Sequence, residues 1–117
     1  MSGGAVSAVK LAELEPQFLV VETPGKAYRY VDTLAEAQGI RFLCPKCFSA
    51  NGGPAGTHSV ICWFKDRDVP ATEEPLPGRW TVVSGHGYGD LTLTASILIT
   101  SGCMWHGFVT AGEIVNC

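Results

Sequence analysis

Charged residues are scarce in this chain of 117 residues. Asp, Glu, Lys and Arg make up 16% of it, whereas they make up about a quarter of an average globular domain. Eleven acidic residues outnumber eight basic ones, and the densest charges, at Lys65–Asp68, alternate in sign. Because nucleic-acid affinity depends mainly on clustered Lys and Arg, this composition disfavours a nucleic-acid partner. A sparsely charged surface instead favours contact with a protein partner or a second copy.

The sequence also lacks a long hydrophobic run and a secretory leader. No apolar stretch approaches the ~18 residues that a membrane-spanning helix needs. The first residues, Met1–Ala5, are small and uncharged, unlike the basic start of a signal peptide. We therefore expect a cytoplasmic protein without a membrane segment. Its hydrophobic content of 46% excludes a disordered chain, and its length favours a single domain, 1–117, with a loose tip at Met1–Gly4.

Short β-branched and apolar runs separated by Gly and Pro predict a mainly β fold. The runs are Val6–Leu11, Phe18–Glu22, Ala27–Val31, Ile40–Leu43, His58–Phe64, Trp80–Val83, Leu91–Thr100, Gly107–Thr110 and Glu113–Asn116. The pair Ala111-Gly112 between the last two indicates a hairpin. The nearly all-apolar run His58–Phe64 is expected to be a buried central strand. The polar segment Lys65–Gly78, with three prolines, is expected to be an exposed loop.

One short helix is expected at Leu34–Gln38. Thr33 is a plausible N-cap, Glu36 follows it at the spacing of a capping box, and Gly39 stands where a helix commonly ends. The predicted fold is therefore a small β-sheet or sandwich-like domain with one short helix, stabilised by zinc.

Zinc is expected because two pairs of metal-ligand residues share one spacing. Cys44 and Cys47 stand three residues apart, and so do Cys103 and His106. A structural zinc ion takes four tetrahedral ligands, usually thiolates and imidazoles, and a tight turn directs two such ligands at one ion. Each pair also follows an apolar strand. The sequence thus predicts one structural Zn²⁺ bound by these four residues, which closes the long segment between the pairs.

The cysteines also allow other interpretations. A CxxC pair also occurs in redox dithiols, but there it begins a helix within a βαβ unit. The glycines and proline that follow Phe48 predict no helix here. Cys62 is expected to be a buried core thiol, and Cys117 a frayed chain end.

Proton-transfer chemistry is offered by three further residues, namely His58, His86 and Asp90. A small hydrolase or peptidase-like enzyme would use them as a proton-transfer group and its orienter. The interpretation that we favour has His58 capping a strand and His86 exposed in a turn. Four protein ligands would also leave the zinc ion no open position for an activated water. A role without catalysis is therefore expected.

Five segments resemble a family of small uncharacterised proteins from tailed-phage genomes and from bacterial operons that encode ubiquitin-like conjugation components. The segments are FLCPKC, GTHSVICWF, PGRW, SGHGYGDLTLTASILIT and SGCMWHGFVTAGEI, within Gly39–Glu113. Family members show a CPxC-like pair, a GTH strand, an LTL-x-x-S-I strand and a C-x-W-H-G-F close. Some members are named ammonia monooxygenase, which implies a large membrane-bound copper enzyme and does not fit this short, thiolate-rich chain.

The resemblance implies a phage-encoded protein with Cys44, Cys47, Cys103 and His106 as metal ligands, but it implies no molecular activity. Together with the composition, it leads us to expect a zinc-stabilised accessory protein that contacts a protein partner. The alternatives are a small hydrolase that uses His58, His86 and Asp90, and a nucleic-acid-binding zinc protein.

Overall fold

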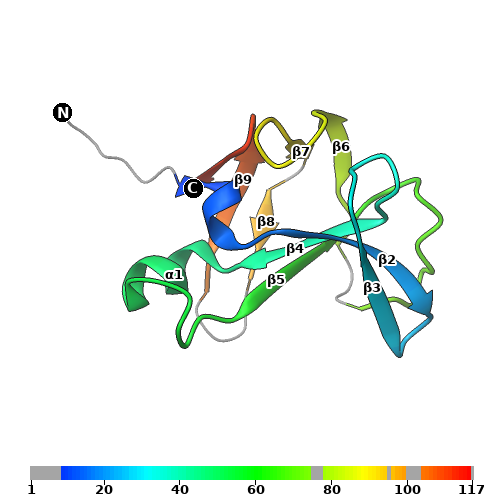
Figure 1. The fold of residues 1–117 in the computed structure, drawn as a ribbon, viewed down its shortest axis with the longest axis horizontal. Coiled ribbons are helices and arrows are strands. Elements are labelled where there is room, and N and C mark those ends of the chain that lie inside the picture. Colours follow the sequence, from blue (N-terminus) through cyan, green and yellow to red (C-terminus); the bar gives the residue numbers. More distant parts are fainter. Residues whose placement is uncertain (1–8, 75–77, 95, 100–103, 117) are drawn as a thin grey trace.

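The computed structural model of the protein describes residues 9–74, 78–94, 96–99 and 104–116. The fold is mainly β, as predicted, with three antiparallel sheets and a single α-helix in the described part of the chain (Figure 1). The elements are β1 (Val9–Lys10), the 3-10 helix η1 (Leu11–Leu14), β2 (Gln17–Thr23), β3 (Ala27–Val31), β4 (Gly39–Leu43), α1 (Pro45–Asn51), β5 (Ser59–Trp63), β6 (Thr81–Ser84), β7 (Thr92–Thr94), β8 (Ile97–Leu98), β9 (His106–Thr110) and β10 (Glu113–Asn116). No helix among these is long and apolar enough to span a bilayer.

The first sheet has the strand order β3-β2-β4-β5. Its last strand was predicted to be central, and that prediction is wrong, because β5 pairs only with β4 within the sheet. The other edge of β5 is met at one end by Trp80, whose N–H donates to the Trp63 carbonyl at 3.0 Å. Val60 and Cys62 of β5 are buried in the core between the layers, and Trp63 is buried on the opposite face, where it packs against Tyr28. Burial alone therefore did not require hydrogen bonds on both edges of the strand.

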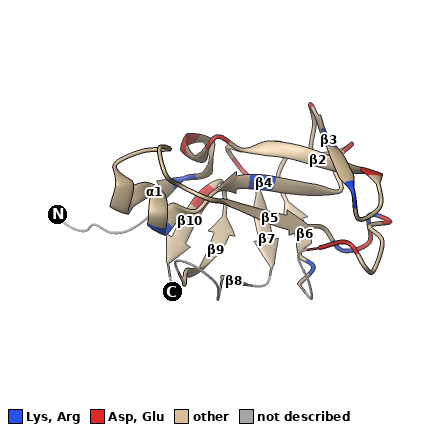
Figure 2. Ribbon diagram, turned by 90° about the horizontal axis from the view of Figure 1, so that it is seen from below, with Lys and Arg blue, Asp and Glu red and all other residues tan. Residues whose placement is uncertain are grey.

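The second layer consists of the sheet β1-β10-β9-β8 and the ribbon β6-β7, which lie together across one face of the first sheet (Figure 2). The core lies between the layers and includes Phe18, Ile40 and Phe42 from the first, and Leu93, Val109 and Ile114 from the second. This arrangement confirms the expected sandwich-like character of the domain.

The hairpin between β9 and β10 is confirmed, with Glu113 opposite Thr110. Its two turn residues, Ala111 and Gly112, both have left-handed backbone angles, with φ of 49° and 79°, as a type I′ turn requires. The Gly112 N–H donates to the Leu91 carbonyl at 2.9 Å, so the hairpin is held beside the end of the loop that precedes β7.

The helix expected at Leu34–Gln38 is absent, and that prediction is wrong. Only a turn forms at 34–36. The capping contact is nevertheless present, because the Thr33 hydroxyl accepts the N–H of Glu36 at 3.3 Å. The chain enters β4 at Gly39, which leaves too few residues to extend one turn into a helix.

The observed helix α1 begins instead inside the CxxC motif. Pro45 occupies its first turn, where a missing N–H costs nothing. Gly52 ends it with a left-handed φ of 70°. The N–H of Gly52 donates to the Ser49 carbonyl and that of Gly53 to the Phe48 carbonyl, which is the hydrogen-bond pattern of a Schellman motif.

Three other predicted segments differ in part. Of Val6–Leu11, the described residues form β1 and the start of η1. The run Leu91–Thr100 contains two short strands, β7 and β8, in place of one. The loop that begins at Lys65 is largely exposed as far as Glu74, although Glu73 within it is buried. The predicted loose tip at Met1–Gly4 lies outside the described residues.

Candidate metal centre

Cys44 and Cys47 are brought together by the junction between β4 and α1. Cys44 follows the last residue of β4 and is the N-cap of α1, with an extended backbone (φ −61°, ψ 122°). Cys47 lies in the first helical turn that follows. The change from strand to helix thus directs both thiols to one side of the chain. The two cysteines carry thiols, and Cys44 is completely buried whereas Cys47 is half-buried.

His58 is placed by the register between β4 and β5. Leu43 lies opposite Ser59, so Cys44 and His58 lie opposite each other just beyond the paired strands. The Cys44 N–H donates to the His58 carbonyl at 2.8 Å, which extends the ladder by one bond. The histidine is exposed, so it lies on the solvent side of the buried Cys44.

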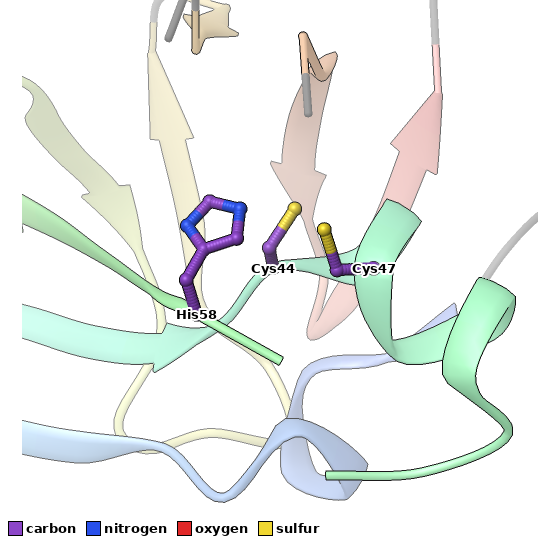
Figure 3. A group of neighbouring side chains, drawn as sticks. All are labelled: Cys44, Cys47 and His58. Carbon is purple, nitrogen blue, oxygen red and sulfur yellow. The ribbon is translucent and has the colours of Figure 1, made fainter. Parts of the chain in front are cut away.

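The three side chains converge. One ligand atom from each of Cys44, Cys47 and His58 lies within 4.8 Å of the other two, and Figure 3 shows both thiols and the imidazole pointing to the same side. Sulfur ligands of a tetrahedral zinc ion lie roughly 3.8 Å apart when Zn–S bonds are about 2.3 Å. Small side-chain rotations therefore suffice for all three to bind one ion. The group is a Cys₂His metal-binding candidate.

The segment that carries the second predicted ligand pair lies beside this group. Lys46, between the two cysteines, donates its Nζ to the Met104 carbonyl at 3.4 Å. The Trp105 ring packs edge-on against Phe42 of β4, with centroids 6.4 Å apart. Cys103 itself lies outside the described residues.

His106 is not part of the group that the structure brings together. It is the first residue of β9 and pairs with Leu98 of β8. Its neighbours Trp105 and Gly107 are buried, whereas His106 is exposed. Because successive side chains of a strand point to opposite faces, His106 lies on the outer face of its sheet and Trp105 faces the core.

The two remaining candidates for proton transfer, His86 and Asp90, contact each other and not His58. Asp90 Oδ2 lies 3.2 Å from His86 Nδ1, and Asp90 Oδ1 accepts the backbone N–H groups of His86 and Gly87 at 2.8 and 3.0 Å. Those backbone hydrogen bonds lower the pKa of Asp90 to about 2. The His86 side chain is 98% exposed, as the favoured interpretation expected.

The expectations for the other cysteines have separate outcomes. Cys62 is a fully buried core residue, as predicted, and burial raises the pKa of its thiol. Cys117 lies outside the described residues. The argument against a redox dithiol assumed that no helix follows CxxC, and this assumption is wrong, because α1 starts at Pro45. The βαβ setting of a redox site is nevertheless missing, since β4 and β5 on either side of α1 are antiparallel.

The ligand spacing in the sequence does not predict that His58 lies with Cys44 and Cys47. A signal for it was present, since an apolar strand ended in Cys44 and the next strand along the chain began after His58. If two consecutive strands pair antiparallel, the end of the first meets the start of the second. That rule alone would have placed His58 beside the CxxC motif.

Comparison with known proteins gives no match: no family model matches the chain, and neither a curated protein nor a solved structure is similar enough to it to count as one. The site is therefore argued from its own geometry.

Proposed function

We propose that the protein is a zinc-stabilised binding domain, in which a structural zinc ion holds the two layers together and an exposed sheet face contacts a protein. The observation that carries the metal is the convergence of Cys44, Cys47 and His58. Two thiolates and one imidazole are donors that suit zinc, whereas magnesium and calcium prefer oxygen ligands.

A fourth ligand would close the coordination sphere, and we propose Cys103 for that place. The sequence supports it, because Cys103 precedes Met104, whose carbonyl accepts a hydrogen bond from Lys46. For the imidazole ligand, the same geometry supports His58 over His106, which lies on the outer face of β9. The proposed set thus keeps the predicted Cys₃His composition but contains His58 in place of His106.

Metal analysis of two matched histidine variants tests this set. His58 and His106 are both exposed histidines at strand starts, so His58→Ala and His106→Ala remove equal side chains. We expect near-equimolar zinc in the wild type and in His106→Ala, and weaker zinc binding in His58→Ala. Loss of zinc from His106→Ala alone would restore the original sequence-based set and refute ours.

The contact face is proposed on the outer side of the sheet that contains β8, β9 and β10. Leu98, Phe108 and Val115 are large apolar residues exposed there, and Phe108 lies directly opposite Val115. Figure 2 shows no Lys, Arg, Asp or Glu along β9 and β8. Contiguous exposed apolar surface typically marks an interaction site.

Light scattering and capture experiments test the contact face. Phe108→Ser should weaken self-association or partner capture, whereas Val83→Ser, at an even more exposed apolar position on β6, should not. Equal effects of the two substitutions would remove the case for this face.

A second candidate function follows from the number of ligands in the described group. Catalytic zinc sites use three protein ligands and leave one position to water, and Cys₂His is one such set. Cys103→Ser separates the two candidates. A structural site with four ligands should lose affinity for zinc, whereas a catalytic site should retain both the metal and any hydrolytic activity.

A further inference from the structure

A small cavity lies at the end of the molecule remote from Cys44 and Cys47. One wall is the turn between β2 and β3 together with the first two residues of β3, from Gly25 to Tyr28, and the other is the segment 72–74 of the loop that follows β5. In Figure 1 this turn and helix α1 lie at opposite ends of the long axis. The cavity has a volume of about 270 Å³, which exceeds the size of a single water molecule several times.

The residues that line this cavity include a buried glutamate, Glu73. Glu73 is only 7% exposed, and its Oε1 accepts the Gly25 N–H at 2.9 Å. Within the described ranges, no Lys, Arg or His forms an ion pair with Glu73. Burying a charge is costly unless a partner of opposite charge or several hydrogen bonds compensate it. One hydrogen bond compensates Glu73 only in part, so a cation in the cavity would be favoured.

An aromatic wall stands next to the carboxylate. Tyr28 lines the cavity, and its ring pairs with Tyr30 at 6.2 Å and edge-on with Trp63 at 6.3 Å. The Trp63 indole N–H donates to the Glu74 carbonyl at 2.7 Å, which fixes the loop wall against the aromatic wall. Aromatic faces attract alkylammonium groups, most strongly when a site also excludes water.

The loop wall is held in place before any ligand arrives. Arg79 donates to the carbonyls of Pro70 and Glu73 at 3.1 and 2.8 Å, and it does not line the cavity. A wall that is already ordered loses little conformational freedom on binding. Among the lining residues, the two carboxylates of Glu73 and Glu74 outnumber the single ammonium of Lys26.

We infer that this cavity binds an alkylammonium group, as carried by a lysine side chain or by a small free amine. The Glu73 carboxylate would receive the ammonium, and the Tyr28 ring would cover its alkyl chain. The inference does not depend on the proposed zinc site. A lysine on a protein partner is one source of the group, and this source would add specificity to the contact proposed above.

Titration of the zinc-loaded protein tests the inference, with backbone amide NMR shifts of Gly25 and Glu73 as the signal. The probes are n-butylammonium, Nα-acetyl-lysine methylamide and the same lysine derivative acetylated on Nζ. We expect the two ammonium probes to bind at least about tenfold more tightly than the neutral one, a difference of about 1.4 kcal/mol. Stronger binding of the lysine derivative would identify a protein source, and equal binding a free amine.

Four variants sharpen the test, one of which is expected to strengthen binding. Glu73→Gln retains an acceptor for the Gly25 N–H but removes the charge, and it should weaken ammonium binding about tenfold. Glu74→Gln, the matched control on the exposed neighbour, should weaken it less. Lys26→Ala removes a competing positive charge and should strengthen it. Tyr28→Leu, at a 38% exposed position, keeps apolar bulk and should weaken it.

The inference is overturned if the acetylated probe binds as well as the charged ones, or if no probe shifts these amides. It is equally overturned if Lys26→Ala weakens binding of the ammonium probes, because removal of a competing positive charge should strengthen it. The zinc content of every variant is measured as well. A loss of ammonium binding at full zinc content would leave the proposed metal site untouched, so the two proposals fail separately.

Discussion

The role of the proposed zinc ion can be measured with two buried cysteines, Cys44 and Cys62. Cys44 and Cys62 are both completely buried and both belong to the hydrophobic core. Cys62 lies in β5, and Cys44 directly follows the adjacent strand β4. Of the two, only Cys44 has its thiol within 4.8 Å of ligand atoms of Cys47 and His58. Replacing each by alanine removes the same atoms from the core, and only Cys44→Ala also removes a proposed metal ligand. A difference in zinc content and in the response to a chelator therefore reports on the metal.

The expected magnitudes follow from this comparison. Removal of one buried sulfur should cost about 1–2 kcal/mol of unfolding free energy in either variant, as for other small truncations in cores. Cys44→Ala should also lose the linkage to zinc, which is worth about 4 kcal/mol when free zinc is 1,000 times its dissociation constant. For a domain of this size, 1 kcal/mol corresponds to roughly 4 °C in melting temperature. We therefore expect Cys44→Ala to melt roughly 15 °C below Cys62→Ala.

The assay combines elemental analysis with thermal melts in the presence and absence of a chelator. Wild type and Cys62→Ala should contain near-equimolar zinc and should melt at lower temperature after chelation. Cys44→Ala should contain little zinc and should respond little to the chelator. The reasoning is refuted if both variants retain equal zinc and melt together, or if chelation leaves the wild type unchanged.

Three further predictions concern the fold around the sites. Gly112→Ala should destabilise the protein by at least about 2 kcal/mol, since a Cβ there would collide with the Gly89 carbonyl. Ala111→Gly should stabilise it by about 1 kcal/mol, because glycine adopts the left-handed backbone angle at this position without strain. Urea titrations of the two variants measure both changes in unfolding free energy. Because the folded-state pKa of Asp90 is lowered, its contribution to stability is present above the unfolded-state pKa near 4 and lost as the pH falls towards 2. Asp90→Asn should therefore remove part of the acid dependence of unfolding, and an unchanged pH profile would contradict the assignment. Limited proteolysis should cut first near the exposed Ala71, and cleavage within β5 would contradict the loop assignment.

Much of the strand pattern was predictable because it depends on local sequence. The limits of β3 agree with the predicted Ala27–Val31, and the β9–β10 hairpin follows from Ala111-Gly112. The helix was misplaced because a real capping signal at Thr33 was not followed by enough chain before β4. The observed helix α1 also has local sequence signals, Pro45 at its start and Gly52 at its end. These signals were overlooked because the CxxC motif was interpreted as a metal-binding turn.

The position of β5 could not be read from its composition. An all-apolar strand indicates burial on both faces, and burial on both faces suggests a central position. In this protein, the second layer covers one face, and Tyr28 packs against Trp63 in β5. The strand is therefore buried and yet lies at the edge of its sheet. Only the pairing of β2 with β4, between residues that are far apart in the sequence, reveals this order.

The same long-range pairing explains why the i, i+3 spacing predicted only part of the group of possible metal ligands that the structure brings together. Equal i, i+3 spacing identifies residues that one turn can bring together, as it does for Cys44 and Cys47. Which further residue lies beside such a pair depends on the register of the sheet. The register between β4 and β5 places His58 beside Cys44. Cys44 is also part of the core beside Phe42, which Trp105 of the second layer contacts. A metal at this position would therefore join the layers at one end, so its removal should loosen the contact of Trp105 with Phe42 and leave the cavity at Glu73, at the other end, intact.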